Sequence, residues 1–194
     1  LGVNYLGLNS LFTSVLQVLN LAELGVGSAM VYNMYKPIVD NDTAKICALM
    51  RLYRLYYRII GAVVLAGGVL IIPILPSLIK SDLPTDVNLY ILYLLNLIAT
   101  VLTYWLFAYK NSLLQAYQRV DIVSKVTLIT DTAKYMLQLA SLALFRNYYY
   151  YVVIIVLTQV ASNIITALVV NKMYPDYKPV GKLPRNEIKA INGK

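Results

Sequence analysis

The chain has 194 residues, of which 59% are apolar and 13% charged, and its formal net charge is +8. Soluble domains average about 45–50% apolar and about 25% charged residues, so the composition argues against an ordinary soluble domain. The basic residues flank long uncharged blocks and do not form one patch on a polar chain, which excludes a nucleic-acid-binding domain. The chain has no histidine and one cysteine, Cys47, which removes the commonest general base, the commonest metal ligand and any disulfide within these residues.

The first hydrophobic block covers residues 1–35, where Glu23 is the only charge. A helix needs about 20 apolar residues to cross the hydrocarbon core of a bilayer. The block is therefore long enough for one span with an extension, which we place at 4–35. Gly25 and Gly27 follow Glu23 directly and can kink the helix there.

Four more spans follow along the chain. Residues 59–79, 87–109 and 147–171 carry no charge, whereas the block between the last two holds Asp131 and Lys134 near its middle. The sequence predicts an all-α, polytopic membrane helix bundle with five transmembrane helices. The predicted spans are 4–35, 57–79, 85–109, 120–145 and 148–171.

An amphipathic helix is predicted immediately before the second span, over residues 40–57. Asp40 or Asp42 can cap its N-terminus, because a carboxylate accepts hydrogen bonds from the free amides of the first turn. One interpretation is a cytoplasmic extension of the span that lies on anionic headgroups. In the other, Arg54 and Arg58 face the mouth of a cavity.

The basic residues between the spans fall on alternate sides of the predicted bundle. The stretches 34–58, 110–125 and 172–194 hold 14 of the 17 Lys and Arg residues, and the opposite turns hold only Lys80 and Arg146. The positive-inside rule places the three basic stretches in the cytoplasm. The chain start then faces outward, and residues 172–194 form a cytoplasmic basic segment.

Polar side chains recur at helical spacing on four of the five predicted spans. Steps of three and four residues place them on one face of each helix. The face in 120–145 contains Ser124, Thr127, Asp131, Lys134, Gln138 and Ser141, and the face in the first span contains Asn9, Thr13, Gln17, Asn20 and Glu23.

These polar faces have two interpretations. They can hold helices together, with each hydrogen bond contributing about 0.6 kcal/mol, or they can line a water-filled cavity. The charges favour the cavity, because one charge at the bilayer centre costs roughly 2.5–3.5 kcal/mol. Asp131 and Lys134 can pair, but Glu23 must find a cation on another helix, face water or be protonated. We expect a substrate or ion pathway, with a structural ion pair as the alternative.

Several stretches together resemble a known transporter family. Residues 1–8, LGVNYLGL, resemble the LG-x-x-x-x-GL signature that joins the first two helices of polysaccharide flippases. Residues 21–29, LAELGVGSA, resemble the D/E-LG-x-G stretch of their second helix, and the polar loop and amphipathic segment at 42–57 follow in the same order. The chain resembles the polysaccharide transporter branch of the multidrug, oligosaccharidyl-lipid and polysaccharide exporter superfamily, and is similar to bacterial O-antigen and capsule repeat-unit flippases.

The resemblance implies a fold and a function. Residues 1–171 would be helices two to six of the N-terminal lobe of a 12- to 14-helix transporter, and 172–194 would lead to a second lobe beyond this piece. The protein would flip a polyprenyl-diphosphate-linked oligosaccharide across the bacterial cytoplasmic (inner) membrane by alternating access. It would be no enzyme and have no catalytic residue, bound metal or cofactor, and an H⁺ or Na⁺ gradient would drive it. Its partners would be membrane lipid, the lipid-linked oligosaccharide, and polysaccharide polymerase and chain-length proteins.

The candidate site combines the charges with their polar neighbours. Cavities in this family tend to be cationic, which suits a diphosphate. Lys134 matches that expectation, whereas Glu23 and Asp131 fit proton or sodium coupling. The predicted substrate-binding or ion-coupling residues are Glu23, Asp131, Lys134, Gln138, Asn20, Gln17 and Thr127, with Arg54 and Arg58 as cations at the cavity mouth.

Other functions remain as alternatives. A multidrug/cation antiporter would need an acid-lined cavity, for which Glu23 and Asp131 are candidates, and a lipid II flippase belongs to the same superfamily. A membrane-embedded glycan-processing enzyme would need converging carboxylates or histidines and a sizeable loop, and the loops here are short. A non-transporting membrane scaffold is the fourth alternative.

Overall fold

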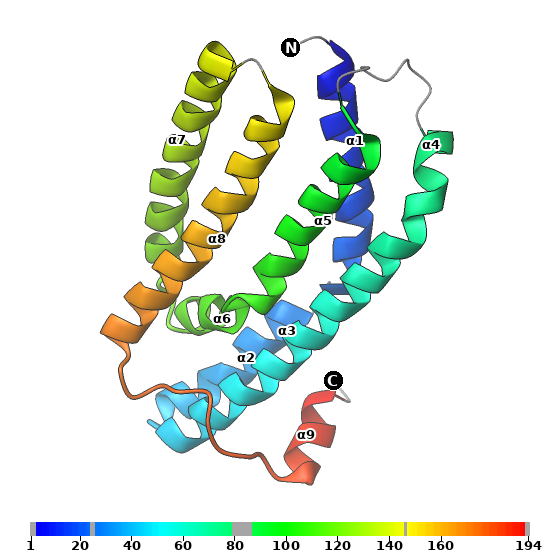
Figure 1. Ribbon diagram of the computed structural model, residues 1–194. Coiled ribbons are helices and arrows are strands. Elements are labelled where there is room, and N and C mark those ends of the chain that lie inside the picture. Colours follow the sequence, from blue (N-terminus) through cyan, green and yellow to red (C-terminus); the bar gives the residue numbers. More distant parts are fainter. Residues whose placement is uncertain (1–2, 24–25, 79–86, 146, 193–194) are drawn as a thin grey trace.

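The chain folds into a bundle of helices, and helices are the only regular elements in the part that the structure describes (Figure 1). This computed structural model describes residues 3–23, 26–78, 87–145 and 147–192. The predicted all-α architecture is confirmed. In chain order the elements are α1 (Val3–Asn20), the 3-10 turn η1 (Leu21–Glu23), α2 (Val26–Val39), α3 (Thr43–Ile71), the 3-10 turn η2 (Ile72–Ile74), α4 (Leu75–Leu78), α5 (Leu89–Trp105), α6 (Ala108–Ala116), α7 (Val120–Phe145), α8 (Tyr148–Met173) and α9 (Arg185–Asn192).

Two or three of these helices are long and apolar enough to cross a membrane. The continuous helical stretch Thr43–Leu78 has 36 residues and α8 has 26, and α5 and α6 form a third candidate if they are counted as one span. Within the described residues, α1 and α7 do not reach the same mean hydropathy. In α1 the amide side chains lower it, and in α7 the charges of Asp131 and Lys134 lower it. Length and hydropathy therefore support a helical membrane protein with two or three such spans.

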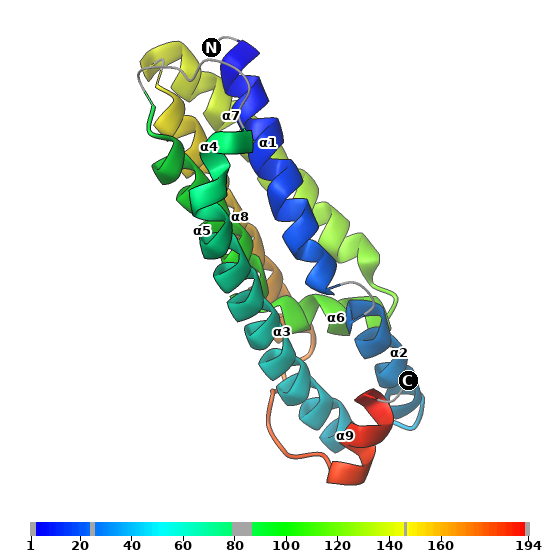
Figure 2. The same cartoon turned by 90° about the vertical axis from the view of Figure 1, so that its right-hand side faces the viewer.

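The first predicted span, 4–35, is interrupted. Helix α1 ends at Asn20, a 3-10 turn follows to Glu23, and α2 begins only at Val26. Figure 2 shows α1 and α2 as separate helices with different directions. The interruption falls where the glycines were expected to kink the helix, although Gly25 lies outside the described residues. It leaves Glu23 at a junction between helices.

The third predicted span, 85–109, bends before its predicted end. Helix α5 stops at Trp105, and α6 continues at an angle of 50°. Phe107, the residue before α6, has a φ of +62°, a left-handed conformation that is unfavourable for a bulky side chain. The bend carries Lys110 sideways into the bundle, where it is buried.

Helix α3 joins the predicted amphipathic segment to the second span without a break. Asp42 is its N-cap and accepts a hydrogen bond from the Lys45 amide at 2.9 Å, as one of the two predicted caps would. At about 1.5 Å per residue, the 36-residue stretch is roughly 54 Å long, whereas the hydrocarbon core is about 30 Å thick. The cap end of α3 therefore extends well beyond the apolar layer.

The helices pack around α5, which lies between α3 and α8, while α1 covers α3 and α5. Helix α7 packs along α8 and touches α6 at its base. Close approach of α3 and α5 depends on Gly61, which faces Trp105, and on Gly68, which faces the buried Leu97. The Tyr93 hydroxyl also donates to the carbonyl of Gly68 at 3.0 Å.

Several basic stretches of the chain gather at one end of the bundle. The start of α1, α4 and the junction of α7 with α8 lie at one end, and the α2–α3 turn, the start of α7, the end of α8 and α9 lie at the other (Figure 1). The basic stretches at 34–58 and 172–192 thus share one end of the bundle. Arg119 and Lys125, at the start of α7, belong to the same end.

The segment after α8 runs back across this end of the bundle. The hydroxyls of Tyr117 and Tyr177 lie 2.6 Å apart, and Tyr174 stacks on Tyr117. Burial and this hydrogen bond raise the pKa of the Tyr117 phenol. The Cys47 thiol contacts the carbonyl of Asp176 at 3.6 Å. The segment after α8 is therefore docked against this end of the bundle.

Candidate functional site

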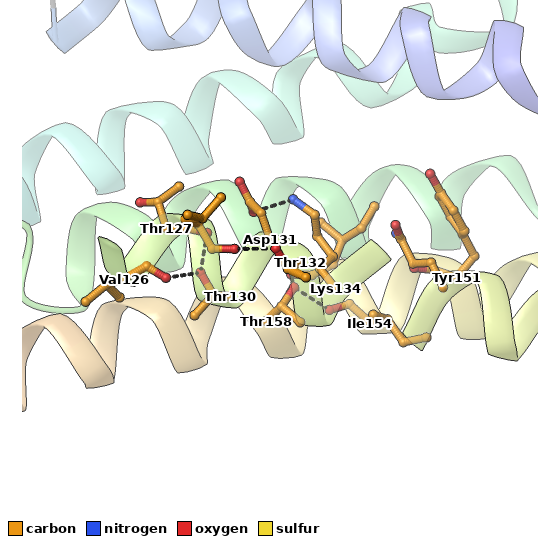
Figure 3. A network of polar contacts seen from close by, with 12 residues as sticks. Val126, Thr127, Thr130, Asp131, Thr132, Lys134, Tyr151, Ile154 and Thr158 are labelled. Atoms are coloured by element: carbon orange, nitrogen blue, oxygen red, sulfur yellow. Dashed lines mark hydrogen bonds and ion pairs between the residues drawn. The ribbon is translucent and has the colours of Figure 1, made fainter. Parts of the chain in front are cut away.

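Asp131 and Lys134 form an ion pair near the middle of α7. Nζ of Lys134 lies 2.7 Å from Oδ1 of Asp131, and the ammonium group also sits 4.7 Å from the centre of the Tyr135 ring. The side chain of Asp131 is 43% exposed and that of Lys134 is 21% exposed. Figure 3 shows both on the side of α7 turned away from α8, whereas Thr130 faces α8 and is buried. The pair therefore lies on the face of α7 that α8 does not cover, which we call the open face of α7.

The predicted polar face of α7 divides into two halves. Toward the chain-start end of the bundle, Gln138 is buried and its amide donates to the carbonyl of Tyr151 at 3.3 Å. Ser141 is also buried, and its hydroxyl has no hydrogen-bond partner among the described residues. In this half the Gln138–Tyr151 hydrogen bond joins α7 to α8, as expected if polar side chains hold helices together, whereas Ser141 adds no such bond.

The other half is open. Ser124, Thr127 and Asp131 line a shallow groove whose walls come from α7 alone. Thr127 is exposed. The groove leads to the Asp131–Lys134 pair, so hydroxyl groups, a carboxylate and an ammonium group share one accessible face. Such a face can attract a cation at Asp131 and an anion at Lys134.

Glu23 lies at the α1–α2 junction and faces two tyrosines. Its carboxylate interacts with the hydroxyls of Tyr57 from α3 and Tyr104 from α5. Tyr57 also pairs with the hydroxyl of Ser112 in α6 at 3.3 Å. Among the described residues Glu23 has no cationic partner, and uncharged tyrosine hydroxyls lie beside it.

The other two predicted residues of the first span differ in their surroundings. Asn20 accepts a hydrogen bond from Tyr104 at 2.9 Å and so joins the cluster around Glu23. Gln17 is exposed on α1. Apart from Gln17, the predicted residues within the spans therefore fall into two groups, one around Asp131 and one around Glu23.

Arg54 and Arg58, predicted at a cavity mouth, line a pocket of about 510 Å³ between α3 and the segment that leads into α9. Arg51 holds the two walls together, since its guanidinium donates to the carbonyl of Gly181 at 2.9 Å. We call this the basic pocket, after the side chains that line it. They are Arg51, Arg54, Arg58, Lys182 and Arg185.

Sequence reasoning missed Lys110 as a buried charge. Its ammonium group is enclosed by α8 and donates to Asn171 at 2.7 Å and to the carbonyl of Ala167 at 3.4 Å. It also lies 4.8 Å from the centre of the Phe107 ring. Lys110 was counted with a cytoplasmic loop, and a bend after Trp105 would have been needed to place it inside. Sequence reasoning also missed three pocket residues, Arg51, Lys182 and Arg185. They come together only because the segment before α9 docks on α3, far away in the sequence.

The described residues contain no group of three or more His, Cys, Asp or Glu side chains that could hold a metal ion. Comparison of the chain with protein-family models, with curated proteins and with solved structures finds no match. The clues to function are therefore the Asp131–Lys134 pair, the residues around Glu23 and the basic pocket.

Proposed function

We propose that the chain belongs to a transporter that flips a polyprenyl-diphosphate-linked oligosaccharide across the bacterial cytoplasmic membrane by alternating access. The observation that carries the proposal is the Asp131–Lys134 pair on the open face of α7. A charged pair in a membrane-length helix is costly unless it meets water or a partner. Neither side chain packs into α8, so the pair suits a face that lines a hydrophilic path.

In this proposal all five predicted helices cross the membrane. The path of the first is interrupted at Glu23, and the path of the third bends at Phe107. Irregular backbone at membrane depth is tolerated where it is buried in protein or lines a cavity. The end of the bundle that carries Arg54, Arg58 and α9 would lie in the cytoplasm, in accordance with the positive-inside rule.

Glu23 supports ion coupling within the same proposal. A carboxylate beside tyrosine hydroxyls, with no cationic partner among the described residues, can bind a coupling ion and release it again. Its position between α1, α3 and α5 would let a change in its charge alter how these helices pack. Glu23→Gln should therefore remove the dependence of transport on the ion gradient.

The carboxylate of Glu23 also supports a second candidate function, that of a multidrug/cation antiporter. There Glu23 and Asp131 would bind the cationic drug directly. The two functions predict opposite effects for Lys134, which attracts an anionic diphosphate but repels a cation.

The test replaces Lys134 with alanine in the chromosomal gene. The flippase proposal predicts loss of surface polysaccharide with drug resistance unchanged, and Lys125→Ala, an exposed lysine at the start of the same helix, serves as the matched control. Normal surface polysaccharide in a strain whose Lys134→Ala protein is present at the wild-type level would refute the flippase. Altered drug efflux in that strain would favour the antiporter.

A further inference from the structure

The basic pocket concentrates positive charge without compensation. Its five cations line one cavity with no acidic side chain among the lining residues. None of the five forms an ion pair with a carboxylate in the described ranges, since the ion pairs there involve Lys45, Arg119, Lys125 and Lys134. Like charges held close together repel one another, and an anion in their midst removes that repulsion.

The pocket is already assembled in the absence of a ligand. Arg51 ties α3 to Gly181, and the Lys45–Glu187 ion pair at 2.9 Å ties α3 to α9. Gly181 has a φ of +91° and lies against Ala48, where an added Cβ would meet the Ala48 side chain at 3.5 Å. The backbone turn that brings Lys182 to the pocket is thus set by packing on α3, and binding an anion there requires little ordering of the chain.

The position of the pocket along α3 indicates where the anion would come from. Arg58 is the last charge before the uncharged stretch 59–79. Arg51 and Arg58 are separated by about 10 Å along the helix, which is comparable with the polar layer of about 5–8 Å on each side of the hydrocarbon core. The cations therefore lie at the level of lipid headgroups.

A row of exposed apolar side chains on α3 runs from the pocket toward the predicted hydrocarbon core. Leu52 and Leu55 line the pocket beside the arginines. Leu55, Ile59 and Val63 follow at steps of four residues and are each more than half exposed. A lipid whose headgroup occupied the pocket could lay an acyl chain along this face of α3 and cover apolar side chains.

We propose that the basic pocket binds the phosphate headgroup of an anionic bilayer lipid, with its acyl chain along the Leu55–Ile59–Val63 face of α3. Arginine guanidinium groups donate paired hydrogen bonds to phosphate oxygens, and Lys182 supplies a further charge from the opposite wall. The bound lipid would hold residues 179–188 against α3. This proposal requires the bundle to lie in a membrane but does not depend on transport.

The protein contains a natural reporter for this site. Trp105 is the single tryptophan, and its indole N–H donates to the carbonyl of Arg58 at 3.2 Å. The purified full chain in neutral detergent would be titrated with dioctanoyl phosphatidylglycerol, dioctanoyl phosphatidylcholine or inorganic pyrophosphate while Trp105 emission is recorded. Phosphatidylglycerol should give a saturable change, and the zwitterionic lipid should not.

Two triple variants separate the pocket from general positive charge. Arg54→Gln/Arg58→Gln/Lys182→Gln should weaken phosphatidylglycerol binding by at least about tenfold. The control Lys172→Gln/Lys178→Gln/Lys189→Gln removes three exposed charges outside the pocket and should weaken it by less than about twofold. Equal loss in the two triples would overturn the proposal. Arg51 is left in place because it holds the pocket walls together.

Two further outcomes are decisive. If the pocket triple fails to fold by circular dichroism, Lys182→Gln alone is measured, and it should weaken binding by about fivefold. Wild-type affinity in this variant would refute the pocket. Pyrophosphate that saturates the signal at the same concentration as phosphatidylglycerol would refute a lipid source, since the acyl chain would then contribute nothing.

Discussion

In the middle of α7, Lys134 donates to Asp131 one helical turn earlier, at 2.7 Å, and neither side chain packs into the adjoining α8. The neighbouring Thr130, Gln138 and Ser141 are buried. The pair thus marks the point where α7 passes from a packed face to an open one. Substitution of Asp131 and Lys134 can separate the contribution of the pair to stability from its contribution to transport.

Asp131→Asn and Lys134→Gln should each lower the free energy of unfolding by about 1–2 kcal/mol, because each leaves one charge unpaired in a mostly apolar helix. The double variant should be more stable than either single variant. Stability is measured by thermal unfolding in detergent, as a double-mutant cycle.

The matched control is the Asp121–Lys125 pair at the start of the same helix. These groups are 3.4 Å apart and largely exposed, so their coupling should be about 0.5 kcal/mol or less. A coupling for Asp131–Lys134 no larger than this control would show that the pair is an ordinary surface contact.

Gly68→Ala should separate α3 from α5. The added methyl carbon would approach Cδ2 of Leu97 to 2.7 Å and Cγ to 3.1 Å, and Leu97 is fully buried. Overpacking of this kind costs about 1–3 kcal/mol. The measurement is the temperature at which the buried Cys47 becomes reactive to a thiol-specific dye.

Gly7→Ala serves as the control for Gly68, since nothing lies within 4 Å of the added carbon. Alanine is the better helix former by about 1 kcal/mol, so this variant should be as stable as wild type or slightly more so. Equal melting temperatures for the two variants would contradict the close packing of α3 on α5.

Lys110→Met should destabilise the contact between α6 and α8. The change removes hydrogen bonds from the ammonium group to Asn171 and to the carbonyl of Ala167 near the end of α8. Hydrogen bonds to charged groups contribute about 1.5–3 kcal/mol. Lys172→Met, at an exposed position next to Asn171, is the control and should be nearly neutral. An unchanged unfolding temperature for Lys110→Met would show that the buried charge contributes nothing.

Raising the pH should release the C-terminal segment. The docked Tyr117 phenol has a raised pKa, whereas the undocked phenol titrates at about 10. The docked form therefore holds its proton more tightly, and docking is complete below pH 10 and weakens as the pH rises above it. Release exposes Cys47, which contacts Asp176 of this segment, and can be followed by its labelling rate.

The thiol itself becomes more reactive with pH, so Tyr117→Phe is measured over the same range. This variant lacks the Tyr117 phenol and should show a smaller increase beyond that of thiol ionisation, because only Tyr174, whose pKa burial also raises, still titrates in the contact. If both proteins give the same profile between pH 9 and pH 11, the tyrosine does not control docking.

Local signals predicted most of the helices. Asp42 indicated the start of α3, and the uncharged stretch 147–171 predicted α8 nearly to its ends. The bend at Phe107 was not predicted, because a bulky residue in a left-handed conformation leaves no local pattern and depends on tertiary packing. The break at Glu23 was indicated only by the glycines that follow it.

The candidate site was predicted less completely. Helical periodicity shows that Thr127 and Gln138 share a face of α7, but it does not show that α8 covers one and leaves the other open. The tyrosine hydroxyls around Glu23 come from α3 and α5, far along the chain. The Arg51–Gly181 contact joins residues 130 positions apart, and no local pattern indicates such a pairing.

The water accessibility of Thr127 in the native membrane tests directly whether the open face of α7 lines a hydrophilic path. In a Cys47→Ala background, Thr127→Cys and Leu157→Cys would be treated in intact cells and in inverted vesicles with a charged methanethiosulfonate reagent. Both parent positions are exposed on the bundle, Thr127 beside the charged pair and Leu157 on an apolar part of α8. A hydrophilic path along α7 predicts rapid labelling at position 127 and none at position 157. No labelling at 127 from either side would mean that the open face of α7 meets lipid, and the transporter proposal would be wrong.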